Sequence, residues 1–427
     1  MLLAAAVVLG AASCAQHKFE TVPGDPMGTM IYTLDNGLKV YMSVNKDTPR
    51  IQTYIAVRSG GKNDPADNTG LAHYLEHIMF KGTEILGTTD YEAEKVLLDK
   101  IEDLYNVYRT KTDEAERRAI YHQIDSLSYE ASKISIANEY DKAMAVIGSR
   151  GTNASTSNDV TNYTEDIPSN QIDAWARVQA DRFKNLVIRG FHTELETVYE
   201  EFNEKESSST IATEQTLQMR DAILYKGIPY CQHSILGKPE HLRNPSISSI
   251  RKFFNTYYQP CNMGIILCGD INPADVIEII DEYFGRLENK MEIPRRAIGD
   301  QYQPLTSPVE VQIPSKEHES VLLSWTYPGL YMADKKTRRE IELLELGMGI
   351  LQNSCCGFLD IEKQKHLLNL AEGSRNLYPE FSNMSIIATP NDGQTLDQVK
   401  EILLEDVRKI GRGEFSDEMI ESCKNVR

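Results

Sequence analysis

The chain has 427 residues, 41% of them hydrophobic and 25% charged, which is typical of globular proteins and unlike disordered chains. Its length allows roughly two or three domains, each with a sizeable core. Its formal net charge is −18, so we expect no nucleic-acid partner, because a negatively charged surface repels the phosphate backbone.

Residues 1–13 form an apolar run rich in alanine, valine and leucine, which is too short to span a bilayer. The run has the length of a signal-peptide core, and its last residues, Ala11, Ala12 and Ser13, precede Cys14 as in a bacterial lipobox. An ordinary cleaved signal fits the same residues. We therefore expect residues 1–14 to direct export to the periplasm or outer membrane, with membrane contact only through a possible lipid on Cys14.

Strands are predicted at the start of the folded part. Residues 30–34 and 38–42 are short runs of strand-forming residues, and Asn36-Gly37 between them is a common hairpin turn. Residues 51–57 form a third predicted strand. A polar loop then leads the chain into its first helix.

Residues 70–80 are predicted to form that helix, because their apolar side chains recur at helical spacing. His73 and His77 lie one turn apart on the same face, a spacing that suits two nitrogen ligands of one zinc ion. Glu76 lies about 60° from His73 around the helix, close enough to take a proton from a water molecule activated by that ion. A partly buried histidine pair with ordinary hydrogen bonds would give the same pattern.

A long helical region follows at about residues 91–144, and a polar break at 110–113 predicts an antiparallel helical hairpin. The hairpin carries many charges but no cluster of chemical interest, so packing or contact with a partner is its default interpretation. Residues 151–163 are predicted to be extended, and residues 171–186 to be an amphipathic helix.

An acidic helix is predicted from Glu194 to Lys205. Thr193 is expected to be its N-cap, because Glu196 follows three residues later in the pattern of a capping box. Glu194 and Glu201 are two turns apart on one face of this helix. A zinc site of this kind needs a third protein ligand, commonly a carboxylate, and Glu201 is the best candidate. The alternative is a helix whose acidic residues are simply solvated.

The later part of the chain repeats the order of the first. Its predicted elements are a helix at 247–258, a strand at 262–270, a helix at 274–287, strands at 309–313, 320–325 and 384–388, and helices at 335–352, 396–410 and 416–426. Residues 290–307 are rich in proline and charge, and we expect the domain linker there. Asp173 precedes Glu194 by 21 residues, and Asp397 precedes Glu418 by the same interval. These features predict two copies of one α+β module.

Only the first copy can hold the histidine site. The corresponding helix of the second copy, at residues 340–347, has no histidine. The sequence also stops nine residues after Glu418, much sooner than the first copy ends after Glu201, so we expect an incomplete second module.

The stretch Asn68-Thr-Gly-Leu-Ala-His73-Tyr-Leu-Glu76-His77-Ile-Met-Phe-Lys-Gly-Thr83 resembles the inverted zinc motif of the inverzincin peptidases. These are the insulinase, pitrilysin and mitochondrial-processing-peptidase family, M16. Further matches are Asn153-Ala154-x-Thr156, Glu194-x-x-x-Val198-x-x-Glu201 and Tyr258-x-Pro260-x-Asn262-Met263. The resemblance implies mainly antiparallel sheets covered by helices, in a catalytic module at residues 28–289 and an incomplete, non-catalytic module at 308–427.

The resemblance implies a zinc-dependent metalloendopeptidase or oligopeptidase with one Zn²⁺ per chain. His73, His77 and Glu201 match the metal ligands of the family, and Glu76 matches the general base. Glu194 matches an acid that supports the site.

The substrate that the resemblance implies is a peptide or a small unfolded protein. Asn153 and Ala154 match the edge strand to which such a substrate adds as a further strand. The downstream half of the same polypeptide, or a partner chain, would complete the enclosing chamber.

Two alternatives remain at this stage, a non-catalytic partner subunit and a peptide-binding module without turnover. His77 and Glu201 are 124 residues apart, and family spacing is about fifty residues shorter. The helical hairpin is therefore expected to be an insertion.

Overall fold

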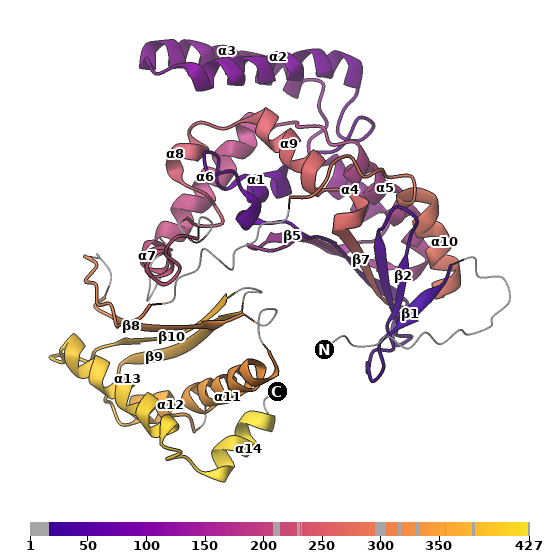
Figure 1. Cartoon of the computed structure of the whole chain (residues 1–427). Coiled ribbons are helices and arrows are strands. Elements are labelled where there is room, and N and C mark those ends of the chain that lie inside the picture. Colours follow the sequence, from indigo (N-terminus) through magenta and orange to yellow (C-terminus); the bar gives the residue numbers. More distant parts are fainter. Residues whose placement is uncertain are drawn as a thin grey trace. The chain divides into compact units, whose positions relative to one another are not determined.

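The computed structural model describes residues 17–207, 214–228, 231, 233–294, 305–314, 318–329, 334–354, 356–377 and 381–425 (Figure 1). The predicted export signal at residues 1–14, including Cys14, lies outside the described residues. The chain divides into two compact units. The first comprises residues 1–202 and 233–295, and the second comprises residues 203–232 and 296–427. Among the described helices, none has both the length and the apolar character of a membrane span.

The first unit is built on a seven-stranded sheet with the order β1-β2-β3-β7-β4-β6-β5. Its strands are β1 (Phe19–Thr21), β2 (Met30–Thr33), β3 (Lys39–Val44), β4 (Arg50–Val57), β5 (Arg150–Thr156), β6 (Thr161–Pro168) and β7 (Met263–Gly269). Neighbouring strands are antiparallel except β3 and β7, which run parallel. The predicted β2–β3 hairpin is confirmed, and its Gly37 adopts the positive φ that such a turn requires. The edge strand β5 leads towards the candidate site.

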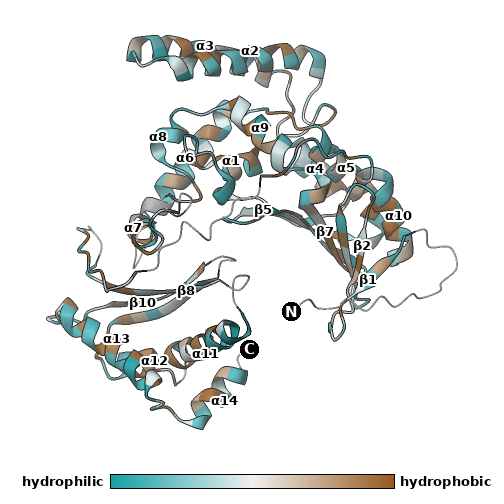
Figure 2. Ribbon diagram, in the orientation of Figure 1, coloured by the Kyte–Doolittle hydropathy of each residue, from teal (hydrophilic) through white to brown (hydrophobic). Residues whose placement is uncertain are grey.

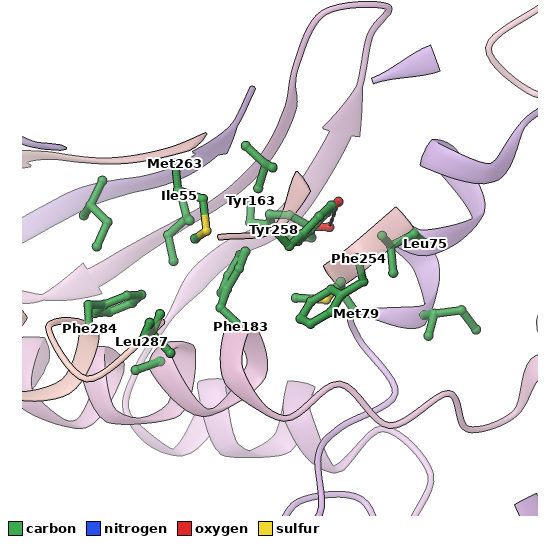
Figure 3. Packing of buried hydrophobic residues seen from close by; sticks show 14 of the residues in the cluster. Ile55, Leu75, Met79, Tyr163, Phe183, Phe254, Tyr258, Met263, Phe284 and Leu287 are labelled. Carbon is green, nitrogen blue, oxygen red and sulfur yellow. Dashed lines mark hydrogen bonds between the residues drawn. The ribbon is translucent and has the colours of Figure 1, made fainter. Parts of the chain in front are cut away.

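The helices of the unit form its core together with this sheet. They are α1 (Leu71–Ile78), α2 (Tyr91–Thr110), α3 (Glu114–Ser132), α4 (Glu139–Val146), α5 (Ile172–Lys184), α6 (Phe191–Ser207), α8 (Pro239–Leu242), α9 (Ile247–Tyr257) and α10 (Pro273–Phe284). Helix α2 packs against α3 and α9. Alternate residues of β4, β6 and β7 are buried, as expected for strands with one covered face. Figure 3 shows Ile55 and Met263 of the sheet beside Phe183 of α5 and Phe284 of α10.

The predicted helical hairpin is confirmed as α2 and α3, which lie side by side and are separated at residues 111–113 (Figure 1). Hydrophobic and hydrophilic residues are mixed along both helices (Figure 2). Ile101 and Tyr105 of α2 and Ile124 of α3 are buried in the same hydrophobic cluster as Leu75 of α1. The hairpin therefore contributes to the core of the first unit.

The predicted start of the acidic helix is wrong. Helix α6 begins at Phe191, and the amide of Glu194 already donates to the carbonyl of Gly190 at 2.9 Å. Gly190 has a φ of +63°, a conformation that glycine adopts without strain. Thr193 therefore lies inside the first turn, and the capping-box pattern does not mark the N-cap.

The second unit contains a three-stranded antiparallel sheet in the order β8-β10-β9. Its elements are β8 (Val321–Pro328), β9 (Leu370–Leu377), β10 (Phe381–Thr389), α7 (Glu214–Leu224), α11 (Lys335–Gln352), α12 (Phe358–Gln364), α13 (Leu396–Gly411) and α14 (Asp417–Asn425). The expected fold class, mainly antiparallel sheets covered by helices, is confirmed in both units. Strand β9 and the helices α7 and α12 were not predicted.

Two further expectations differ from the structure of the second unit. Residues 309–313 form no strand, and Val309 and Val311 are exposed instead of pairing with a neighbour. Residues 203–232 belong to this unit, although residues 28–289 were expected to form one module. Their attachment is explained by Tyr225, whose ring centroid lies 4.1 Å from that of Phe381.

Candidate metal centre

Helix α1 is held at its N-terminus by a side chain from the preceding loop. The carboxylate of Asp64 accepts hydrogen bonds from the backbone amides of Gly70 at 2.7 Å and Ala72 at 2.9 Å. These amides would otherwise be unsatisfied, as at every helix start. Gly70 has a φ of +84°, and a Cβ at this position would lie 2.4 Å from the carbonyl oxygen of Leu236. Only glycine therefore fits where α1 begins.

Replacement of Asp64 by Ala should lower the free energy of unfolding by about 2 kcal/mol, because two buried amides lose a charged acceptor. Urea denaturation measures this loss. Asp67 is exposed in the same loop and provides a matched control, and Asp67→Ala should change the stability by less than about 0.5 kcal/mol. Equal stability of the two variants would show that Asp64 does not anchor the helix.

Three side chains from α1 and α6 direct possible ligand atoms to one point. Nε2 of His73 lies 3.3 Å from Nε2 of His77 and 3.5 Å from Oε2 of Glu201. Nε2 of His77 lies 3.7 Å from the same carboxylate oxygen. Ligands of a tetrahedral zinc ion, each about 2.0–2.2 Å from the metal, are separated by about 3.3–3.6 Å. Two nitrogens and one carboxylate oxygen at these separations fit zinc and leave a fourth position for water or substrate.

Glu194 contacts the far side of one histidine. Its Oε1 lies 2.8 Å from Nδ1 of His77, and its Oε2 forms an ion pair with Lys81. The contact with Nδ1 orients the ring so that Nε2 faces His73 and Glu201. Glu194 was predicted as a supporting acid, and the structure places it in contact with His77.

The contact between Glu194 and His77 favours the charged forms of both side chains. Burial acts to raise the pKa of Glu194, but hydrogen bonds from His77 and Lys81 outweigh burial and hold it below its ordinary value. Burial acts to lower the pKa of His77, but the hydrogen bond to Glu194 and the charge of Glu201 outweigh burial and raise it. The carboxylates therefore create a negative potential that attracts a cation.

Glu76 is buried beside the three possible ligands but is not one of them. Its Oε2 accepts a hydrogen bond from the hydroxyl of Thr156, the last residue of β5. The sequence placed Thr156 in a matching motif but did not indicate this contact. Glu76 and Thr156 are 80 residues apart in the sequence. The only sequence signal for their contact was that both residues lie in segments that match motifs of the family.

Asn153 and Ala154 lie on the same strand as Thr156. They pair with Thr164 and Tyr163 of β6, and β5 is one of the two edge strands of the described sheet. Asn153 is exposed, whereas Ala154 is partly buried against the core. The outer backbone edge of β5 can therefore accept another extended chain, and this edge ends at the contact with Glu76.

Two family models match the chain. The model described as Insulinase (Peptidase family M16) matches residues 39–96, a range that includes His73, Glu76 and His77. The model described as Peptidase M16 inactive domain matches residues 246–427. Together the two models of this family cover more than half of the chain.

Individual relatives agree with the family models. The chain is 23% identical over 426 residues to the zinc protease PqqE of Helicobacter pylori, which is 98% of this chain and 81% of that protein. It is 23% identical over 260 residues to the probable mitochondrial-processing peptidase subunit beta of Schizosaccharomyces pombe. That match covers 61% of this chain and 46% of the fungal protein, so the chain spans about half the length of this relative.

Two solved structures share the fold. A protease from Helicobacter pylori has a TM-score of 0.68 and 21% identity, with 96% of this chain and 83% of that chain covered. The periplasmic protease PqqL from Escherichia coli has a TM-score of 0.67 and 16% identity, with 95% of this chain and 40% of that chain covered.

Proposed function

The chain belongs to the M16 (insulinase) family of peptidases, and on that premise we propose that it is a zinc-dependent peptidase. One observation carries the proposal. His73, His77 and Glu201 direct three donor atoms to one point at separations suited to zinc, and Glu76, a carboxylate outside this set, lies beside them. A set of ligands next to a carboxylate that is not itself a ligand is the arrangement that metal-assisted hydrolysis requires.

Each nearby side chain has a role in the proposed reaction. Zinc, when bound here, supplies a Lewis acid that activates water and polarises the peptide carbonyl. Glu76 accepts the proton of the attacking water and passes it to the leaving amine. The Thr156 hydroxyl keeps the carboxylate of Glu76 turned towards the site, and Glu194 keeps His77 in its binding orientation.

The proposed substrate is a peptide or a small unfolded protein. An extended segment would pair with the outer edge of β5 at Asn153 and Ala154, and the backbone would supply much of the contact. Such pairing places few demands on side chains, so we expect broad sequence tolerance. A further half, on the same polypeptide or on a partner chain, would enclose the substrate.

We also propose that the enzyme works outside the cytoplasm, in the periplasm or at the outer membrane. Residues 1–14 have the pattern of an export signal, and PqqL, which shares the fold, is a periplasmic protease. A lipid on Cys14 would attach the enzyme to the membrane.

A second candidate function is that of a non-catalytic family member. The match to the inactive-domain model favours it for residues 246–427. That range contains none of the four residues His73, Glu76, His77 and Glu201. The first unit therefore supports the catalytic proposal over this alternative.

Removal and return of the metal test the proposal. Dialysis against a chelator should abolish hydrolysis of an unfolded polypeptide, and one equivalent of zinc per chain should restore it, because His73, His77 and Glu201 form a site for one ion. Elemental analysis should find one zinc per chain before dialysis. Hydrolysis that continues at full rate in metal-free protein would refute a zinc-dependent mechanism.

A further inference from the structure

A buried ion pair links the helical hairpin to the segment that precedes α6, and the proposed mechanism does not use it. Glu94 of α2 is fully buried and Arg189 is 5% exposed. Their contact is bidentate, with Nε to Oε1 at 2.6 Å and Nη2 to Oε2 at 2.7 Å. Burying two charges is costly unless every remaining donor is also satisfied. The other partners of Arg189 are therefore informative.

Those partners lie on the loop that follows α1. Nη1 of Arg189 donates to the carbonyl oxygens of Lys81 at 2.7 Å and Leu86 at 3.2 Å, and Nη2 donates to that of Thr83 at 3.1 Å. This loop makes room for the guanidinium, because a Cβ on Gly87 would lie 2.7 Å from Nη1. One side chain therefore joins α2 to the loop that leaves the histidine helix.

The same loop reaches the candidate metal centre. Lys81, whose carbonyl is held by Arg189, pairs through its ammonium group with Glu194, and Glu194 contacts Nδ1 of His77. Glu194 also follows Arg189 by five residues, at the start of α6. Arg189 therefore restrains both segments whose side chains meet behind His77.

We propose that Glu94 and Arg189 are positioning residues for the metal centre. Through them α2 fixes the loop at Lys81 and the start of α6, so that Glu194 holds His77 in its binding orientation. This inference rests on the proposed metal site but extends it to the hairpin, which the proposed reaction leaves without a role. If the pair only stabilised the fold, its removal would lower the stability and leave metal binding unchanged.

The test compares two variants on the same helix. Glu94→Gln keeps the size of the side chain and removes its charge. Glu102→Gln is the matched control, because Glu102 also lies on α2 and pairs with an arginine, Arg251, at 2.8 Å, but that arginine belongs to α9. Cobalt(II) is the probe. Its affinity is measured by competition with a chromophoric chelator, and its visible absorption spectrum reports the coordination geometry.

Glu94→Gln should weaken cobalt binding by up to about 10-fold, less than the roughly 10- to 100-fold that loss of a direct partner of a ligand costs, and should alter the visible spectrum. Glu94→Asp, which keeps the charge, should restore part of the affinity. Glu102→Gln should stay within about twofold of the wild type. A Glu94→Gln protein that is less stable but binds cobalt with unchanged affinity and spectrum would overturn the proposal.

A second variant keeps the test decisive if Glu94→Gln does not fold. The side chain of Lys81 is 30% exposed, so Lys81→Met removes a partly exposed ammonium group, and the carboxylate of Glu194 keeps its contact with Nδ1 of His77. The route from Arg189 to His77 passes through Lys81, and the variant should therefore also weaken cobalt binding. An unchanged affinity would refute the route. Failure of the proposed metal site can be distinguished from failure of this positioning role, because without the site even the wild-type protein would bind no stoichiometric cobalt.

Discussion

Replacement of Glu76 by Gln should remove peptide hydrolysis while zinc stays bound. Glutamine has the same shape as glutamate, and its amide oxygen can still accept the hydrogen bond from Thr156. It cannot accept the proton of an attacking water, and loss of a general base typically lowers the rate by about 10²- to 10⁴-fold. Because Glu76 is outside the cluster of His73, His77 and Glu201, the zinc content should remain one per chain.

The measurement pairs turnover of an unfolded polypeptide with elemental analysis of the same sample. Glu84→Gln is a suitable control, because Glu84 is exposed on the loop after α1 and this substitution removes the same charge as Glu76→Gln. Wild-type turnover in Glu76→Gln would contradict the proposed chemistry. A peptide-binding module without turnover predicts a different pattern, in which peptide affinity is the same in both proteins and neither hydrolyses the peptide.

The elements that the sequence predicts well are those with a strong local pattern. The β2–β3 hairpin depends on Asn36-Gly37, and the break between α2 and α3 depends on a short polar stretch. Both signals lie within a few residues of the feature that they predict. The position of the histidines on α1 follows in the same way from helical spacing.

Elements that depend on distant partners were missed or misplaced. Residues 309–313 alternate like a strand, but a strand needs a neighbour, and Val309 and Val311 remain exposed. Strand β9 contains Gly373 and several polar residues, and it is stabilised by pairing along its whole length with β10. Local propensity does not report either outcome, because pairing is decided by the rest of the fold.

The candidate site shows the same difference between features with a local pattern and features that depend on distant partners. Spacing along α1 and α6 suggested His73, His77 and Glu201, and the structure brings these residues together. The contact between Thr156 and Glu76 spans 80 residues, and that between Arg189 and Glu94 spans 95. Neither contact has a sequence signature, because the first depends on how β5 packs beside α1 and the second on how α2 packs against the segment before α6. The roles of all these side chains remain predictions that the variants test.

Replacement of His77 by Ala should release the zinc ion. Only two of the three donors would remain, and Glu194 would lose the imidazole that it now orients. The loss of affinity should exceed the roughly 10- to 100-fold that removal of an outer partner costs, because a ligand itself is removed. Elemental analysis after gel filtration measures the loss, and circular dichroism checks that the fold is retained.

Elemental analysis of further variants decides which carboxylate is the third ligand. Glu201→Gln exchanges a charged oxygen ligand for a neutral one and should weaken zinc binding, since Oε2 of Glu201 lies 3.5 Å from His73 and 3.7 Å from His77. Glu200 and Glu204 are exposed on the same helix, and their Gln variants are matched controls that should keep the metal. If zinc is lost from one of these controls and kept by Glu201→Gln, the third ligand has to be reassigned. Full zinc occupancy in His77→Ala would instead refute the whole site, because no arrangement of the remaining donors on α1 then accounts for the bound ion.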